Sequence, residues 1–282
     1  MFLVRLLFFL CFFVGISLPA NAVVNFETKD KNLEILYTSF VNYPPFGKYS
    51  KIRLNWNTSK EIYDSIFSKF ANRFFEENKV KSQLVVSDDY ETLIRQVRAG
   101  DIEILFGAYY NTKIYDGLDY VMPAVIDNPV VLIMMPKNVN KVKSLNDLQK
   151  LKGAIFANDM FNDFVNSEIN KYKPIKENDS LEMFRKLFIG EIDYIFASYY
   201  YGVAEASSLG LISRISISKQ PIWNMPMFIA VSKASPNHVS ILQSLNHFIK
   251  NKENIQSLNN DLQNAIRELE QKSLHITPPV FD

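Results

Sequence analysis

Two stretches with the same layout decide the fold class: RQVRAGDIEILFGA at residues 95–108 and RKLFIGEIDYIFAS at residues 185–198. In each, a helical pattern ends at a glycine, an acidic residue follows, and an apolar run is typical of a buried strand. Glycine suits a helix end because it adopts left-handed backbone angles at little steric cost. The recurrence indicates either a generic helix-to-strand junction used twice or two similar lobes, each with its own sheet. The length of 282 residues favours two lobes.

The rest of the chain alternates in the same way. Apolar runs predict strands, and apolar residues three or four positions apart predict helices. Such alternation is typical of an α/β fold with mostly parallel sheets. We expect strands at 32–40, 82–87, 103–108, 130–137, 153–157, 193–197, 210–218 and 227–233, and helices at 60–77 (capped by Asn57, Thr58 or Ser59), 88–100, 144–151, 160–172, 180–190 and 238–271 with a break near Asn251.

The N-terminal residues 1–22 have the three parts of a secretory signal peptide. Arg5 is the only charge, an apolar run extends from Leu6 to Leu18, and Ala20-Asn21-Ala22 forms an A-x-A cleavage site. The apolar run is shorter than the roughly 20 residues that a membrane-spanning helix needs. We therefore expect cleavage after Ala22 and a mature protein in the periplasm.

Composition excludes several partners. The chain has 31 basic and 30 acidic residues, and removal of Arg5 with the signal peptide makes the two numbers equal. Without a basic excess, neither nucleic acid nor an anionic membrane is an expected partner. The only cysteine, Cys11, lies in the signal peptide, so no disulfide is expected. The three histidines lack metal-ligand spacing, and we expect neither a metal site nor a cofactor.

A tyrosine-rich loop follows one of the expected strands. The stretch GAYYNTKIYDG, residues 107–117, holds Tyr109, Tyr110 and Tyr115 around a single cation, Lys113. Loops at strand ends often carry ligand contacts. Aromatic rings with hydroxyls suit a flat ligand that also forms hydrogen bonds.

Several motifs occur in an order that resembles the family-3 extracellular solute-binding proteins, the amino-acid-binding periplasmic receptors of ABC importers. They are YPPF (43–46), YETLIRQVRAGDIEILFG (90–107), SLNDLQKLKGAIFA (144–157), LEMFRKLFIGEIDYIFA (181–197) and FIAVSK (228–233). The resemblance implies a two-lobe periplasmic-binding-protein-like fold of type II. Each lobe would be a mixed sheet flanked by helices, with two crossover strands as a hinge that closes on ligand.

The resemblance also implies a division of the chain. Residues 24–127 would form the first part of lobe 1, residues 128–228 would form lobe 2, and residues 229–282 would return to lobe 1 and add the C-terminal helices. The crossovers would fall near residues 126–129 and 221–224. The protein is expected to be a monomer.

Carrying the family's site across gives a set of ligand-binding candidates. Two family anchors are absent: Tyr115 stands where an Arg clamps the ligand carboxylate, and Ser198 stands where an Asp pairs with the ligand amine. Lys113 is either a substitute for that Arg or a solvated charge. A small polar or aromatic ligand is therefore expected rather than a standard amino acid. The candidates are Tyr43, Phe46, Gly107, Tyr109, Tyr110, Tyr115, Asn158, Asp159 and Ser198.

Three functions fit these features. The first is a non-catalytic solute-binding protein that delivers its ligand to the membrane permease of an ABC importer. The second is a periplasmic enzyme on the same fold, resembling cyclohexadienyl dehydratases, with Asp159, Asp127 or Asp116 as proton donor. The third is the ligand-sensing subunit of a signalling system.

Overall fold

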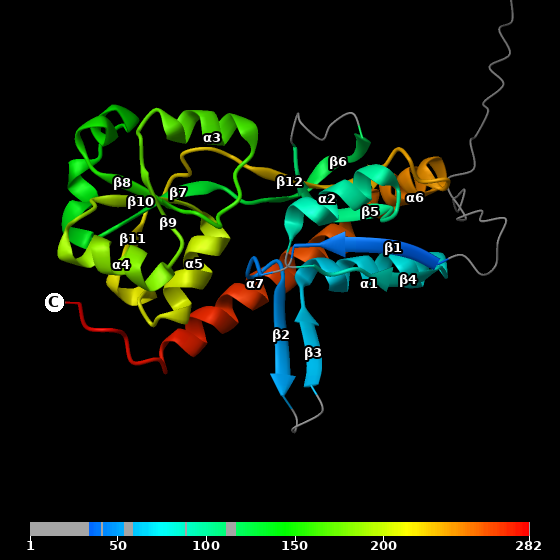
Figure 1. Ribbon diagram of the computed structural model, residues 1–282, viewed down its shortest axis with the longest axis horizontal. Helices are drawn as coiled ribbons and strands as arrows, with labels where there is room; N and C mark the ends of the chain where they lie inside the picture. The colour runs from blue at the N-terminus through cyan, green and yellow to red at the C-terminus, as the bar shows by residue number, and fades with distance from the viewer. Residues whose placement is uncertain (1–33, 41, 54–58, 88, 111–116, 282) are drawn as a thin grey trace, which may run out of the picture.

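Two five-stranded sheets form the centres of two lobes in the computed structural model (Figure 1). The structure describes residues 34–281 apart from 41, 54–58, 88 and 111–116, so the expected signal peptide lies outside the described residues. We call the sheet near the N-terminus, with its helices, lobe 1, and the other sheet, with its helices, lobe 2.

The sheet of lobe 1 has the order β4-β1-β5-β12-β6. Strand β1 runs parallel to β4 and β5, whereas β12 is antiparallel to both β5 and β6. Helices α1 and α2 pack against this sheet, as does α6. The bounds are β1 Glu34–Ser39, β4 Lys81–Leu84, β5 Ile104–Tyr109, β6 Leu118–Asp127, β12 Pro226–Ser232, α1 Ile66–Asn78, α2 Tyr90–Ala99 and α6 His238–Lys250.

The sheet of lobe 2 has the order β11-β7-β10-β8-β9. Strands β10, β8 and β9 are parallel, and β7 is antiparallel to β10 and β11. Helices α3, α4 and α5 surround it (Figure 1). The bounds are β7 Val130–Met134, β8 Gly153–Phe156, β9 Ile175–Glu177, β10 Tyr194–Ser198, β11 Ser216–Ile217, α3 Asp163–Asn170, α4 Ser180–Ile189 and α5 Tyr199–Ser208, with 3-10 turns at Pro136–Lys141, Leu145–Lys150 and Ile212–Arg214.

The two repeated sequence stretches occupy equivalent places. Helix α2 ends at Gly100 (φ 86°) and α4 ends at Gly190 (φ 83°), both in the left-handed region. The strand that follows, β5 or β10, is the central strand of its sheet and is buried throughout. The same local signal therefore builds the centre of each lobe, which is the second of the two interpretations offered by the sequence.

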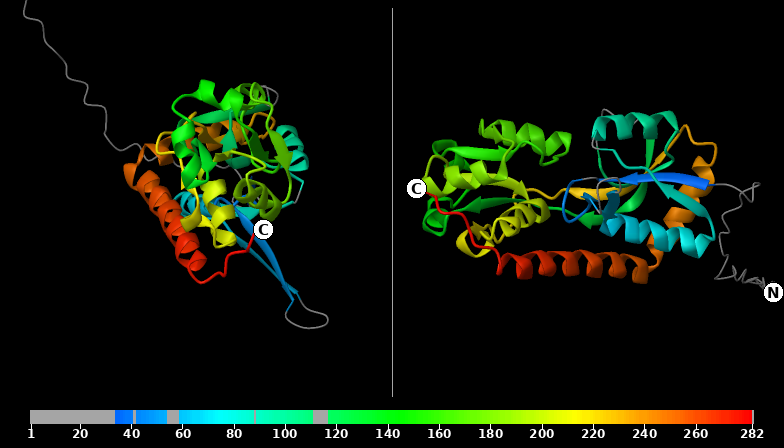
Figure 2. Two further views of the ribbon diagram at one scale, coloured as in Figure 1. Left: turned by 90° about the vertical axis from the view of Figure 1, so that its left-hand side faces the viewer. Right: turned by 60° about the horizontal axis from the view of Figure 1, so that its bottom comes forward.

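Several sequence predictions are wrong. The sheets are mixed and not mostly parallel, because β12 and β7 each pair antiparallel with both of their neighbours. Residues 60–64 are not helical, because strand β3 (Ser59–Asp64) pairs along its whole length with β2 (Lys48–Arg53). This hairpin extends away from both lobes (Figures 1 and 2). Helix α1 begins only at Ile66, and its cap is Ser65, whose hydroxyl accepts a hydrogen bond from the amide of Ser68. Periodicity within one segment does not reveal a partner strand.

The segment 210–218, expected to be one strand, contains a 3-10 turn at Ile212–Arg214 followed by the two-residue β11. Gly210 has a positive φ of 69°, which lies outside the backbone angles of a strand. The elements that were not predicted at all include β2, β9, α5 and β6. Helix α5 is buried around most of its circumference and so lacks a one-sided apolar stripe, and β6 contains Pro123, which an edge strand tolerates.

The chain crosses between the sheets twice. Residues 128–129 connect β6 to β7, and residues 218–225 connect β11 to β12. The two crossover segments are joined by backbone hydrogen bonds from the amide of Asn128 to the carbonyl of Met225 (3.0 Å) and from the amide of Val130 to the carbonyl of Trp223 (2.8 Å). The crossings therefore form a short antiparallel pair between the lobes.

A third connection runs along one side of the molecule. Helix α7 (Lys252–Ser273) packs against α1 and α6 of lobe 1 and against α5 of lobe 2 (Figure 2). Arg73 of α1 donates to Asp261 of α7 at 2.9 Å. Beyond the helix, Arg214 donates to the carbonyl of Pro279, and the rings of Phe188 and Phe281 lie 5.0 Å apart. We call α7 and residues 274–281 the C-terminal strap.

Within the described residues, no helix combines the length and apolar character needed to span a bilayer.

Candidate ligand site between the lobes

A buried group of polar side chains lies where the lobes meet. We call it the interlobe cluster: Tyr43, Tyr109, Asn128, Asp159 and Ser198. Tyr43 stands in the turn after β1, which the Tyr43–Gly47 backbone pair closes, and Tyr109 ends β5. Asp159 follows β8, and Ser198 ends β10. The carboxyl ends of β1 and β5 in lobe 1 and of β8 and β10 in lobe 2 thus meet at one place, a common location for ligands in α/β proteins.

Direct hydrogen bonds join the lobes in the cluster. The Tyr43 hydroxyl of lobe 1 donates to Asp159 Oδ1 of lobe 2 at 2.7 Å and lies 2.7 Å from Ser198 Oγ. Within lobe 2, Ser198 binds both carboxylate oxygens of Asp159, from its hydroxyl to Oδ1 and from its amide to Oδ2, each at 2.6 Å. Asp159 is therefore the shared acceptor of hydrogen bonds from both lobes.

Proton counting shows that this junction is short of a donor. The oxygens of Tyr43 and Ser198 and Oδ1 of Asp159 lie within 2.6–2.7 Å of one another. Each hydroxyl has one proton to donate. With Asp159 ionised, both protons go to Oδ1, and the Tyr43–Ser198 contact has none. Protonated Asp159, or one additional donor, would complete the ring of three hydrogen bonds.

The electrostatics of the site agree with this count. Burial raises the pKa of Asp159 from 3.8 to about 6, although the hydrogen bonds from Ser198 and Tyr43 oppose the rise. Burial, and then the nearby Asp159 carboxylate, hold the pKa of Tyr43 well above its usual value, so the phenol keeps its proton. Among the described residues, no cationic side chain forms an ion pair with Asp159.

Aromatic side chains surround these three hydrogen-bonded oxygens. Tyr201 of α5, in lobe 2, stacks on Tyr43 with centroids 5.0 Å apart and planes 13° apart. Phe46 also stacks on Tyr43, at 5.8 Å and 18°. Phe156 meets Tyr201 edge-on at 5.6 Å. The junction therefore combines a polar end at Asp159 with flat apolar faces contributed by both lobes.

Asn128 connects the cluster to the first crossover segment. Its Nδ2 donates to the Tyr109 hydroxyl at 2.8 Å, and its Oδ1 accepts the amide of Tyr200 at 3.3 Å. The Tyr109 hydroxyl is in turn 3.5 Å from the Tyr43 hydroxyl. Neither Asn128 nor Tyr201 was among the residues expected from sequence. The signal for Asn128 was its place at the predicted crossover; Tyr201 had none, because α5 was not predicted.

The remaining sequence candidates that the structure describes lie outside the cluster. Phe46 is buried behind Tyr43, and Gly107 packs with its positive φ of 90° against the Phe67 ring. Tyr110 is 43% exposed, with its ring 5.3 Å from that of Tyr120, and Asn158 is exposed. Tyr115 and Lys113 lie outside the described residues.

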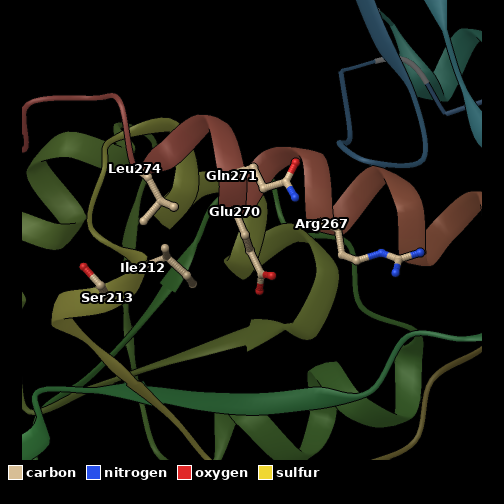
Figure 3. A pocket seen from close by; sticks show the side chains of 6 residues that line it. All are labelled: Ile212, Ser213, Arg267, Glu270, Gln271 and Leu274. Carbon is tan, nitrogen blue, oxygen red and sulfur yellow. The ribbon is translucent and has the colours of Figure 1, made fainter.

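A separate hollow of about 330 Å³ lies between the C-terminal strap and the turn before β11 (Figure 3). Arg267 and Glu270 of α7 line it together with apolar side chains. No residue of the interlobe cluster borders it. The lining residues are Ile212, Ser213, Arg267, Glu270, Gln271 and Leu274.

Solved structures share this two-lobed arrangement. The GluR0 ligand-binding core in complex with L-glutamate is 12% identical, with 83% of this chain and 100% of that chain covered and a TM-score of 0.63. A histidine kinase sensor domain with similarity to periplasmic binding proteins is 13% identical, with 87% and 98% covered and a TM-score of 0.58. The substrate-binding protein of an amino acid ABC transporter is 18% identical, with 86% and 99% covered and a TM-score of 0.52.

Sequence comparison does not extend these similarities. No protein-family model matches the chain. No curated protein matches it. The structural matches establish the fold: the chain has the type II periplasmic-binding-protein fold, as predicted, and its structure matches those of family-3 solute-binding proteins at low sequence identity.

Proposed function

We propose that this protein is a periplasmic solute-binding protein that captures a small polar or aromatic ligand between its lobes for an ABC importer. The mature protein begins after Ala22, acts as a monomer and delivers its ligand to a membrane permease. Its lobes divide near residues 128 and 228. The observation that carries the proposal is the interlobe cluster, in which each lobe contributes part of one polar site.

The division of the cluster between lobes suits capture by closure. When the lobes separate, Asp159 and Ser198 remain together on lobe 2, because their mutual hydrogen bonds are internal to that lobe. Tyr43 leaves with lobe 1 and exposes the carboxylate. A ligand placed on that carboxylate would then meet Tyr43 and Tyr109 on closure, and hinge closure of this kind couples binding to a change in shape.

The anchors also support a ligand other than a standard amino acid. Ser198 stands where the family resemblance expects an Asp, and Asp159 supplies a carboxylate from the neighbouring loop instead. Tyr115 stands where an Arg is expected. A ligand whose carboxylate is buried without a cationic partner would lose several kcal/mol of binding free energy.

A ligand screen on the mature protein tests the proposal. Protein spanning residues 23–282 is unfolded, dialysed and refolded to remove carried-over ligand, and is then screened by thermal shift against small metabolites. We expect at least one compound to raise Tm in the wild type and to lose its effect in Asp159→Asn, while the matched control Asp101→Asn, the same change at an exposed residue of lobe 1, keeps it. Failure of every compound to stabilise a folded, ligand-free sample would contradict solute binding.

One observation favours an enzyme as the second candidate. A carboxyl group whose pKa is about 6 is poised to donate a proton near neutral pH, and Asp159 has this property because it is buried. Dehydration of prephenate or arogenate by the wild type, abolished in Asp159→Asn, would support an activity resembling the cyclohexadienyl dehydratases. Absence of turnover with a compound that binds leaves the solute-binding proposal in place.

The similarity to a histidine kinase sensor domain favours a sensing role as a third candidate. Neighbouring genes discriminate this role from transport: a permease and an ATPase indicate import, whereas a membrane kinase indicates sensing.

A further inference from the structure

The Tyr43 side chain is itself placed in the manner of a bound ligand. Its ring stacks on Tyr201 of lobe 2, and its polar tip meets Asp159 and Ser198 of the same lobe. Tyr43 belongs to lobe 1, and it is only 1% exposed. Lobe 2 therefore presents a flat aromatic face next to a hydrogen-bonding carboxylate, and the chain fills both with its own side chain.

Tyr43 satisfies this site incompletely. A phenol brings one proton, and the ring of Tyr43, Ser198 and Asp159 lacks one when the carboxylate is ionised. An ammonium group brings up to three N–H donors at the same end of the molecule. One of them reaches Asp159, and another reaches the oxygen of Ser198, which is the acceptor that the phenol leaves without a proton.

The acidic groups around the site also favour an ammonium group as the ligand. Asp159 is buried and, within the described residues, has no cationic partner. The charged groups that act on the tyrosines of α5 are also acidic: Glu205 and Asp159 on Tyr201, and Asp127 on Tyr200. A buried carboxylate is stabilised by a cation that also forms hydrogen bonds, and aromatic faces attract cations as well.

We propose that the interlobe cluster selects a ligand with a protonated amine attached to a flat apolar body, and that this amine displaces the Tyr43 hydroxyl from Asp159 and Ser198. The inference rests on the proposed solute-binding function and specifies its ligand class. Asp159 is then the counter-ion of the ligand, Tyr201 is the face on which the body stacks, and Tyr43 is an internal competitor for the same place.

Three probes of one shape test the charge requirement. Isothermal titration of the wild type is carried out with 2-phenylethylamine (cation), 2-phenylethanol (neutral) and 3-phenylpropionate (anion). We expect the amine to bind at least about tenfold more tightly than either of the others, because it alone forms a charge-assisted hydrogen bond to Asp159. Equal or tighter binding of the alcohol or the carboxylate would overturn the proposal, and no variant is needed for this comparison.

Two variants then test the residues. Asp159→Asn should lower the affinity for the amine by about tenfold or more without lowering that for the alcohol, because it removes the negative charge while one amide oxygen still accepts a hydrogen bond. Tyr43→Phe should raise the affinity for the amine, because the hydroxyl that competes for the same place is removed. Weaker amine binding in Tyr43→Phe would show that the hydroxyl is a ligand contact instead of a competitor. Circular dichroism establishes that each variant is folded.

The outcomes separate this inference from the proposed function. If the metabolite screen yields a ligand without an amine, solute binding stands and the ligand class is wrong. If the screen yields an amine whose affinity falls in Asp159→Asn, both stand. If neither the probes nor the library bind to folded, ligand-free protein, both fail.

Discussion

The phenol oxygen of Tyr43 and a carboxylate oxygen of Asp159 lie 2.7 Å apart although they come from opposite lobes. Both side chains are buried, so this hydrogen bond joins the lobes in a region that excludes most water. Hydrogen bonds to a charged acceptor are stronger than neutral ones, and a buried acceptor that loses its donor is costly. The pair therefore contributes both to the stability of the closed form and to the recognition of whatever replaces the phenol.

Removal of the Tyr43 hydroxyl should destabilise the closed protein. We expect Tyr43→Phe to lower the free energy of unfolding by about 1–3 kcal/mol at pH 8, because Asp159 then keeps fewer donors. Urea denaturation followed by circular dichroism measures the change. Tyr199→Phe, a half-buried tyrosine outside the cluster, is the matched control and should change stability by less than about 0.5 kcal/mol. Equal effects of the two substitutions would contradict a special role for the Tyr43 hydroxyl.

Stability should decrease as pH rises through the pKa of Asp159. Because burial raises this pKa from 3.8 to about 6, the folded protein binds a proton more readily than the unfolded chain. The resulting stabilisation is fully present below about pH 4 and is lost as pH rises through about 6, and it amounts to about 3 kcal/mol. Other titrating groups are shared by both proteins, so the measurement is the difference in unfolding free energy between wild type and Asp159→Asn from pH 4 to pH 8. A difference that does not change with pH would refute the raised pKa.

The C-terminal strap should be energetically coupled to lobe 1 through Arg73 and Asp261. Their 2.9 Å bond is partly buried, and Arg73 also lies over the Phe70 ring, so single substitutions mix several losses. A double-mutant cycle with Arg73→Ala and Asp261→Ala isolates the pair, and we expect a coupling energy of about 0.5–1 kcal/mol.

The exposed pair Lys69–Asp64, at 3.3 Å, is the control for this cycle, and its coupling should be close to zero. A cycle at Arg73 and Asp261 that gives no more coupling than this control would contradict a stabilising contact between α1 and the strap.

Substitutions at two glycines allow the cost of backbone strain to be measured separately from the cost of a steric clash. Gly107 and Gly190 both have a positive φ, but a Cβ at Gly107 would lie 2.5 Å from the Phe67 ring, whereas a Cβ at Gly190 meets no atom within 4 Å. We expect Gly190→Ala to lower the free energy of unfolding by about 1 kcal/mol and Gly107→Ala to lower it by about 2–4 kcal/mol. Similar losses in urea denaturation would show that the Phe67 ring moves aside at no cost.

Local signals in the sequence predicted much of the fold. Gly100 and Gly190 could be identified as helix ends because a glycine cap acts within one turn of the helix. The break near Asn251 between α6 and α7 is confirmed for the same reason, since Asn251 caps the second helix with its own side chain. The hairpin at Lys48–Asp64 was not predictable in this way, because its strands are defined by each other.

The sequence also predicted part of the site, namely its residues but not their contacts. Order along the chain placed Tyr43, Tyr109, Asp159 and Ser198 among the candidates, and the structure brings these four together. Order alone did not reveal that Asp159 and Ser198 bind one another, because that contact depends on how the ends of β8 and β10 are positioned in the sheet. Nor did it reveal that the ring of Tyr43 would occupy lobe 2, since this follows from the closure of one lobe upon the other.

The second crossover segment carries an intrinsic optical probe. The Trp223 ring lies 5.6 Å from Phe196, and the backbone of Trp223 pairs with Val130, the first residue of β7. The chain has two tryptophans, so Trp56→Phe leaves Trp223 as the sole indole. Because this half-buried indole is carried by the segment that links the lobes, we expect a change in lobe separation to alter its solvent contact. The wavelength of its fluorescence emission thus gives the protein a label-free readout of opening and closing, with no dye attached to either lobe.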